Sequence, residues 1–153
     1  MANSAFTVLQ IDHIGVAVNE TAPLTTFLKL LGIHRIGSET IVDQRVSTEM
    51  YDVDSVHVEL LSPTDNQSTI KKFIEKRGEG FHHIAFRVDN LENALSTLSK
   101  AGIQLIDSSP RRGAGGKQIA FLHPKSTGGI LVELSQVDQS YSAVTTGETG
   151  GNL

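Results

Sequence analysis

Short runs of alternating apolar and polar residues, separated by runs with helical spacing, make up most of this chain. Residues 11–18 and 81–88 alternate as strands do, so that every second side chain lies on the same face. Between the strand-like runs, apolar residues recur every three or four positions and stop before a glycine, a common way for a helix to end. These helical runs are Leu24, Phe27, Leu28 and Leu31 before Gly32, and Leu91, Ala94, Leu95 and Leu98 before Gly102.

The chain repeats itself once. IDHIGVAV aligns with FHHIAFRV, and VHVELLSP aligns with ILVELSQV. His13 therefore corresponds to His83, and Glu59 corresponds to Glu133. Another strand-like run precedes each closing strand, so each half of the chain is predicted to fold as β-α-β-β-β.

This pattern predicts an α+β fold in which two βαβββ units form one cupped, mixed sheet. The units are expected over residues 8–66 and 78–137, joined by a helix near 68–76, so that 8–137 form a single domain. Each unit has one helix, which can cover only one face of its sheet. The uncovered face must therefore curl around a ligand or pack against the other unit. The tail, 138–153, is rich in Ser, Thr and Gly without periodicity, which predicts disorder.

Four polar residues fall on the strand faces that the helices leave uncovered. His13 and His83 lie opposite the bulky residues of their strands, and so do Glu59 and Glu133. A carboxylate in an apolar strand is costly to bury unless it is paired or binds a cation. Two histidines and two glutamates at matching positions therefore predict a divalent metal site, because imidazole nitrogen and carboxylate oxygen suit Co²⁺, Mn²⁺, Ni²⁺, Zn²⁺ or Mg²⁺. His82 falls with the bulky residues and is expected at the rim.

The composition of the chain argues against several classes of protein. The 153 residues carry a formal net charge of −4, which gives no basic footprint for nucleic acid. No apolar run approaches the ~20 residues that a membrane helix needs. The first residues lack the features of a signal peptide, so a cytoplasmic protein is expected. The absence of cysteine excludes disulfides and thiolate metal sites.

The paired units and the four polar residues resemble the vicinal oxygen chelate superfamily, which includes glyoxalase I and extradiol dioxygenases. Within it, the chain is similar to the methylmalonyl-CoA epimerases over about residues 9–137, through IDHIGVAV, VELLSP, GFHHIAFRVDN and GAGGKQIAFLHPKSTGGILVELSQ. The resemblance implies a metal-dependent isomerase of acyl-CoA, Co²⁺ as the first-choice ion, and a homodimer. It implies that the C2 epimers of methylmalonyl-CoA interconvert by proton abstraction through an enolate, with Glu133 as one base.

Inversion at C2 also requires an acid–base group on the opposite face of the enolate. The resemblance aligns Thr48 with a glutamate found in some epimerases, and Glu49 follows it. A two-residue hairpin turn at Val53 and Asp54 would place Thr48 opposite Glu59, and a three-residue loop through Ser55 would place Glu49 there. Glu49 is the candidate second base, with a ligand-bound water or His57 as alternatives.

The glycine-rich stretch RRGAGGK lacks the spacing of a nucleotide-binding loop. Its basic residues Arg111 and Lys117 are instead candidates for contacts with the phosphates of coenzyme A. Two other functions fit the same fold. One is a lactoylglutathione lyase like glyoxalase I, and the other is a non-catalytic protein that binds small molecules, as some resistance proteins do.

Overall fold

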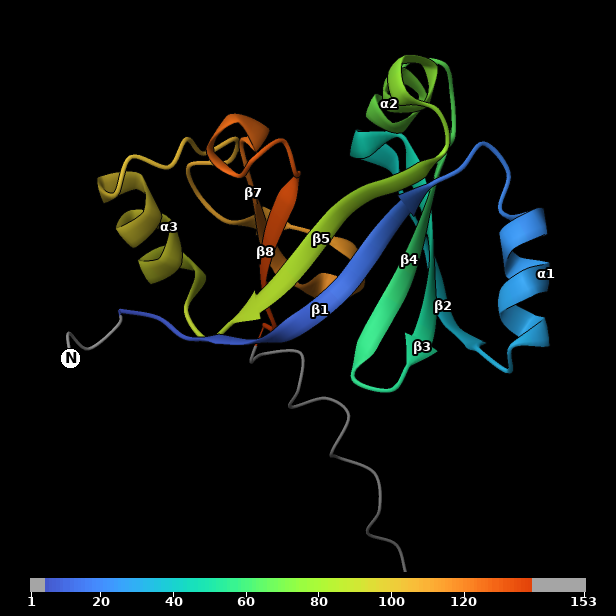
Figure 1. Ribbon diagram of the computed structural model, residues 1–153, viewed down its shortest axis with the longest axis horizontal. Coiled ribbons are helices and arrows are strands. Elements are labelled where there is room, and N and C mark those ends of the chain that lie inside the picture. The colour runs from blue at the N-terminus through green and yellow to red at the C-terminus, as the bar shows by residue number, and fades with distance from the viewer. Residues whose placement is uncertain (1–4, 139–153) are drawn as a thin grey trace, which may run out of the picture.

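The computed structural model describes residues 5–138, and the strands of this part form one strongly curled sheet (Figure 1). The strand order is β2-β3-β4-β1-β5-β8-β7-β6. Read outward from the central pair β1–β5, the order is the same in both halves. The strands are β1 (Val8–Ala17), β2 (His34–Ile41), β3 (Val46–Val53), β4 (Val56–Pro63), β5 (Gly80–Val88), β6 (Arg111–Arg112), β7 (Gln118–Leu122) and β8 (Val132–Gln136). The predicted α+β fold with a cupped, mixed sheet is confirmed.

The central strand pair brings the two halves together. β1 and β5 are antiparallel, with His13 opposite Ala85 and Gly15 opposite His83. β4 runs parallel to β1 and places Glu59 beside Gly15, while β8 runs parallel to β5 and places Glu133 beside Ala85. Four neighbouring strands therefore carry the four predicted polar residues on the concave face of the sheet.

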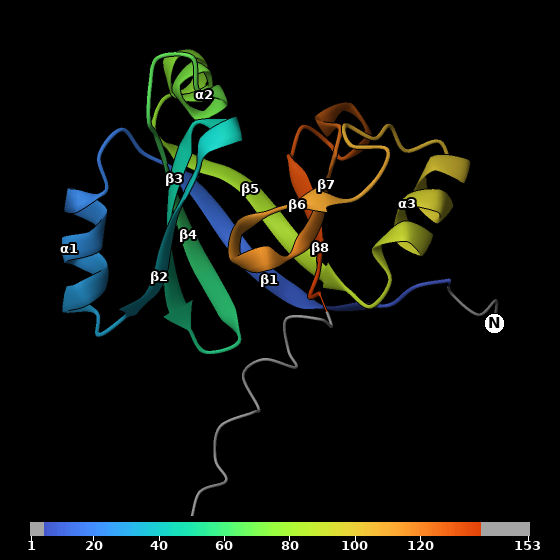
Figure 2. The ribbon, with the colours of Figure 1, turned by 180° about the vertical axis from the view of Figure 1, so that it is seen from behind.

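Two helices cover the convex face, one for each half (Figures 1 and 2). Leu28 of α1 (Ala22–Leu30) packs with Tyr51 and Leu60 of the first half. Leu91 and Leu95 of α3 (Leu91–Lys100) pack on the second half, against a cluster that also contains Val88, Ala120, Leu122 and Leu134. The apolar alternation of the strands supplies these outer contacts and leaves the polar set inside.

A third helix closes one end of the cup. Ile70 and Ile74 of α2 (Thr69–Arg77) pack with Ala17, Val46 and Leu61. The backbone N–H of Ile70 donates to the Ser68 hydroxyl at 3.2 Å, which caps the first turn of this helix. In α3 the cap is Asn90, whose side chain accepts from the backbone N–H of Asn93. The described part of the chain also contains three short 3₁₀ turns: η1 (Val42–Gln44), η2 (Ala114–Gly116) and η3 (Pro124–Ser126).

The hairpin β3–β4 has a register that differs from both predicted registers. Val53 pairs with Val56, so the turn consists of Asp54 and Ser55, and Met50 lies opposite Glu59. Asp54 has a φ of 57°, a left-handed conformation that aspartate tolerates better than most residues. The position of this turn along the chain determines which face each β3 side chain occupies.

The second half also departs from the predicted strand pattern. The counterpart of β2 is only the two-residue strand β6, together with an isolated bridge between Leu105 and Leu122. Pro110, just before β6, has no N–H to contribute to a strand ladder. The predicted tail lies outside the described residues except for Asp138.

Because Leu60 is fully buried between the sheet and α1, we expect Leu60→Ala to lower the free energy of unfolding by about 2–5 kcal/mol. The control is Val42→Ala, since Val42 is 79% exposed and lies outside the clusters that pack against the helices. Urea denaturation measures both variants. Equal, small losses for the two would show that the α1–β4 contact is not part of the core.

Candidate metal centre

Two imidazoles from the central strand pair meet on the concave face. The Nε2 atoms of His13 and His83 lie 2.9 Å apart, and their rings are perpendicular. Both side chains are buried. Gly15 makes this approach possible, because it lies opposite His83 and a Cβ at this position would overlap the His83 ring.

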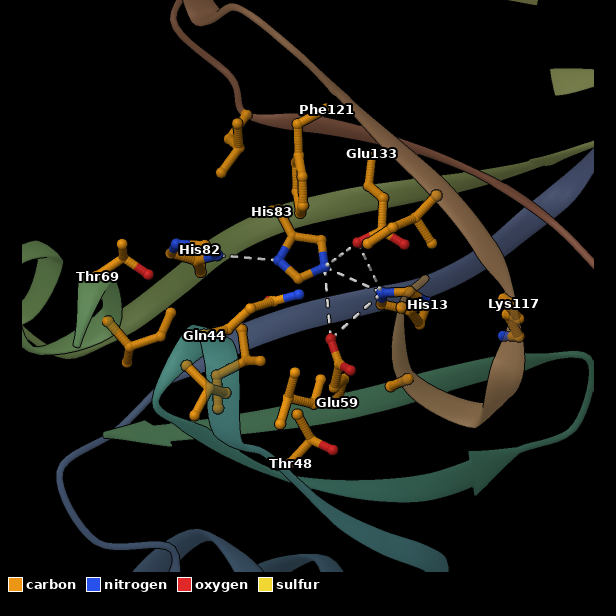
Figure 3. Close-up of a pocket in the computed structure, with 18 of the residues that line it drawn as sticks. His13, Gln44, Thr48, Glu59, Thr69, His82, His83, Lys117, Phe121 and Glu133 are labelled. Carbon is orange, nitrogen blue, oxygen red and sulfur yellow. Dashed lines mark hydrogen bonds and ion pairs between the residues drawn. The ribbon is translucent and has the colours of Figure 1, made fainter. Parts of the chain in front are cut away.

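Two carboxylates approach the imidazole pair from opposite sides (Figure 3). Glu59 Oε2 is 3.3 Å from His13 Nε2 and 3.5 Å from His83 Nε2. Glu133 Oε2 is 3.7 Å and 3.3 Å from the same two atoms. Both glutamates are buried, at 4% and 5% exposure. The structure therefore brings together all four residues that the sequence pattern singles out.

The donor set fits a divalent ion. Ligand atoms of His13, His83 and Glu133 all lie within 4.8 Å of one another, and Glu59 adds a second carboxylate oxygen. Burial by itself would raise the pKa of Glu133, but hydrogen bonds from the two imidazoles lower it to about 2. Burial would likewise lower the pKa of His13, but hydrogen bonds to Asp12, Glu133 and Glu59 raise it to about 11. The cluster thus stabilises positive charge at the point where the Nε2 atoms and carboxylates converge.

Asp12 is an essential part of this arrangement that the alternation pattern did not reveal. It is completely buried, and its Oδ2 accepts from His13 Nδ1 at 2.7 Å and from Lys117 Nζ at 2.5 Å. Arg87 donates to its Oδ1. Burial would raise the pKa of Asp12, yet His13 and Lys117 hold it well below its usual range. When His13 gives up one proton to bind an ion, the ionised Asp12 keeps the remaining proton on Nδ1, which leaves Nε2 to face the centre.

The reason that Asp12 escapes the pattern is a β-bulge. Ile11 pairs with Phe86 and His13 with Ala85, so Asp12 is an extra residue in β1. A bulge re-aims its residue and breaks the two-residue period on which alternation depends. The adjacent pair Asp12–His13 in the sequence is the one signal that could have suggested this contact.

A cavity of about 230 Å³ surrounds the centre. Its polar lining includes Gln44, Thr48 and His82, and its walls include Val46, Met50, Leu61 and Phe121. Arg111 and Lys117, the candidate substrate contacts, line this cavity too. The Arg111 guanidinium lies over the Phe121 ring and donates to Asp107 at 3.1 Å.

The candidate second base Glu49 does not reach the cavity. The observed register turns Thr48 and Met50 toward the centre and Glu49 toward the opposite face. There its carboxylate accepts from the hydroxyls of Thr21 and Tyr51 at 2.8 and 2.7 Å. The structure therefore does not bring Glu49 together with the four converging residues. His57, an alternative base, lines a neighbouring cavity instead.

A model of the Glyoxalase/Bleomycin resistance protein/Dioxygenase superfamily matches residues 12–121. The chain belongs to this superfamily. It is 41% identical over 128 residues to "Uncharacterized protein YqjC" of Bacillus subtilis, across 83% of this chain and 91% of that protein. It is 33% identical over 138 residues to human mitochondrial methylmalonyl-CoA epimerase, across 89% and 78% of the two chains.

A solved structure supports the same relationship. The crystal structure of methylmalonyl-CoA epimerase from Mycobacterium tuberculosis matches with a TM-score of 0.83 and 32% identity, covering 94% of this chain and 96% of that one. The predicted resemblance to the epimerases is confirmed. Within residues 5–138, no helix is long and apolar enough to cross a membrane.

Since a side chain at Gly15 would displace the His83 ring, we expect Gly15→Ala to weaken Co²⁺ binding by roughly 100-fold or more. Gly37→Ala is the matched control, because a Cβ on this β2 glycine meets no atom within 4 Å. Metal content and Co²⁺ titration measure binding, and circular dichroism verifies the fold. A folded Gly15→Ala protein that binds Co²⁺ as tightly as the wild type would contradict the proposed centre.

Proposed function

We propose that the protein is a metal-dependent isomerase of acyl-CoA that interconverts the C2 epimers of methylmalonyl-CoA. The observation that carries this proposal is the convergence of His13, His83, Glu59 and Glu133 in one buried cavity. Relatives whose names state this activity share 33–34% of their residues with the chain, which supports the same assignment.

His13, Glu59, His83 and Glu133 are the residues that would hold the ion. When bound, a divalent cation would act as a Lewis acid on the substrate oxygens that flank C2. Co²⁺ is our first choice, and Mn²⁺, Ni²⁺, Zn²⁺ or Mg²⁺ suit the same nitrogen and oxygen donors.

We assign the first proton transfer to Glu133. Its carboxylate lines the cavity, with Oε2 3.3 Å from His83 Nε2, and the C–H bond of the substrate would break toward this carboxylate as the electron pair moves to the thioester carbonyl. Return of a proton to the opposite face of C2 completes the inversion. Among residues 5–138, Glu59 is the other carboxylate that lines the cavity, and it lies on the opposite side of the imidazole pair. We assign the second proton transfer to Glu59.

Arg111 and Lys117 would contact the acyl-CoA from the rim of the cavity. The Arg111 side chain is 38% exposed and can exchange its bond to Asp107 for a phosphate oxygen of coenzyme A. Lys117 lies deeper, with its ammonium group on Asp12. This ammonium group adds positive charge to the cavity that would receive the acyl group.

We also propose that the chain functions as a homodimer. The outer side of α1 and the following residue expose Phe27, Leu30 and Leu31, at 54%, 81% and 58%. Contiguous exposed apolar side chains of this kind are typical of surfaces that another chain covers. A second copy would bury them.

The decisive assay follows deuterium incorporation at C2 of methylmalonyl-CoA in D₂O. We expect rapid exchange with Co²⁺, loss of exchange after chelation, and recovery when Co²⁺ is restored. Glu133→Gln should lower the rate by roughly 10²- to 10⁴-fold, because an amide cannot accept the proton. Glu49→Gln is the control and should retain the wild-type rate, since this residue faces away from the cavity.

Two results would contradict the proposal. Faster formation of lactoylglutathione from its hemithioacetal than C2 exchange would assign the protein to glyoxalase chemistry. If the metal-loaded protein binds ligands but turns over neither substrate, its function is non-catalytic binding of small molecules.

A further inference from the structure

Another β-bulge of the central strand pair lies at the position that matches Asp12 in the repeat. Gly15 pairs with His83 and Val16 pairs with Phe81, so His82 is an extra residue in β5. Asp12 and His82 thus correspond to each other by position, and each directly precedes a histidine of the metal centre. Both bulged side chains turn toward that histidine instead of lying on the opposite face of the sheet.

The two bulged residues make equivalent contacts. Asp12 Oδ2 lies 2.7 Å from His13 Nδ1, and His82 Nδ1 lies 2.9 Å from His83 Nδ1. In both cases the contact engages Nδ1 and leaves Nε2 directed at the centre. The geometry points to His82 as a positioning residue, which accepts a hydrogen bond from His83 Nδ1 and thereby keeps Nε2 of His83 available as a metal ligand.

The surroundings of His82 hold its ring in place for this contact. The Phe73 ring of α2 packs edge-on against it, with ring centroids 4.6 Å apart, and His82 is perpendicular to His83. Figure 3 shows the contact from His82 to the rear nitrogen of His83, away from the two glutamates. Whereas Asp12 is neutralised by Arg87 and Lys117, no ion pair involving His82 is present within residues 5–138. The two halves therefore support their histidines with different chemistry, a carboxylate on one side and an imidazole on the other.

A hydrogen-bond acceptor behind a metal-binding histidine fixes both the tautomer and the orientation of its ring. Without an acceptor at position 82, His83 can move its proton to Nε2 or rotate out of line. In either state it loses its use as a ligand, although the strand and the helix α2 keep their positions. The role of His82 is therefore separable from its packing against Phe73.

The test compares His82→Phe with His82→Gln. Phenylalanine keeps a ring against Phe73 but cannot accept, whereas the glutamine side chain can present an amide oxygen to His83 Nδ1. We expect His82→Phe to weaken Co²⁺ binding by roughly 10- to 100-fold and His82→Gln to retain most of the affinity. His57→Phe is the matched control, since His57 lines a neighbouring cavity and does not contact His83.

Proton NMR of the Zn²⁺-loaded protein gives a second readout that simple loss of packing would not reproduce. The Nδ1–H signal of His83 should remain in His82→Gln and should shift or broaden in His82→Phe, while thermal unfolding of the metal-free proteins stays close to the wild type. Wild-type affinity in His82→Phe, or an equal loss in both variants, would overturn the inference.

This inference rests on the proposed function only through the metal ion. Wild-type protein that bound no divalent ion would contradict the metal site itself. A metal-binding wild type with an unaffected His82→Phe variant would contradict the role of His82 alone. Metal binding without epimerase activity would leave the role of His82 intact and remove only the proposed reaction.

Discussion

The antiparallel contact between β1 and β5 is the constraint on which the rest of the structure depends. It joins the two halves of the sheet, and its register places each histidine opposite a residue with little or no side chain, Ala85 or Gly15. Only with these small partners can two imidazoles meet at 2.9 Å on the inner face of a curled sheet. Parallel pairing of β4 and β8 against this core then brings one glutamate to each side.

The residues around the metal centre stabilise its buried polar side chains. Two carboxylates and two imidazoles would be costly in an apolar cup if they were unpaired, and here each carboxylate contacts both rings. Asp12 and His82 hold the outer nitrogens of those rings, while Leu61, Val46 and Phe121 form apolar walls. Polar groups therefore converge on one point of the cavity, an arrangement suited to orienting a small charged substrate group beside a cation.

Strand alternation explains which residues of the centre could be predicted from the sequence. The two-residue period of the strands and the internal repeat were sufficient to identify His13, Glu59, His83 and Glu133, because these residues lie in regular parts of their strands. Asp12 was not found because it lies at a bulge, where the period fails, and His82 was placed at the rim for the same reason.

The position of Glu49 has a different origin. Its face depends on which two residues form the β3–β4 turn, and the left-handed conformation of Asp54 places that turn later than either predicted register. Alternation is a local property of a strand, whereas register depends on the partner strand and on the turn. Residues in the regular strands could therefore be assigned from sequence, and residues whose orientation depends on a bulge or a turn could not.

The most direct measurement of the central claim is anomalous X-ray diffraction from crystals of the protein grown with Co²⁺. The account predicts one anomalous peak in the cavity, about 2.0–2.2 Å from Nε2 of His13 and His83 and from one oxygen each of Glu59 and Glu133. A peak bound elsewhere, or a structure in which either glutamate turns away from the ion, would contradict it.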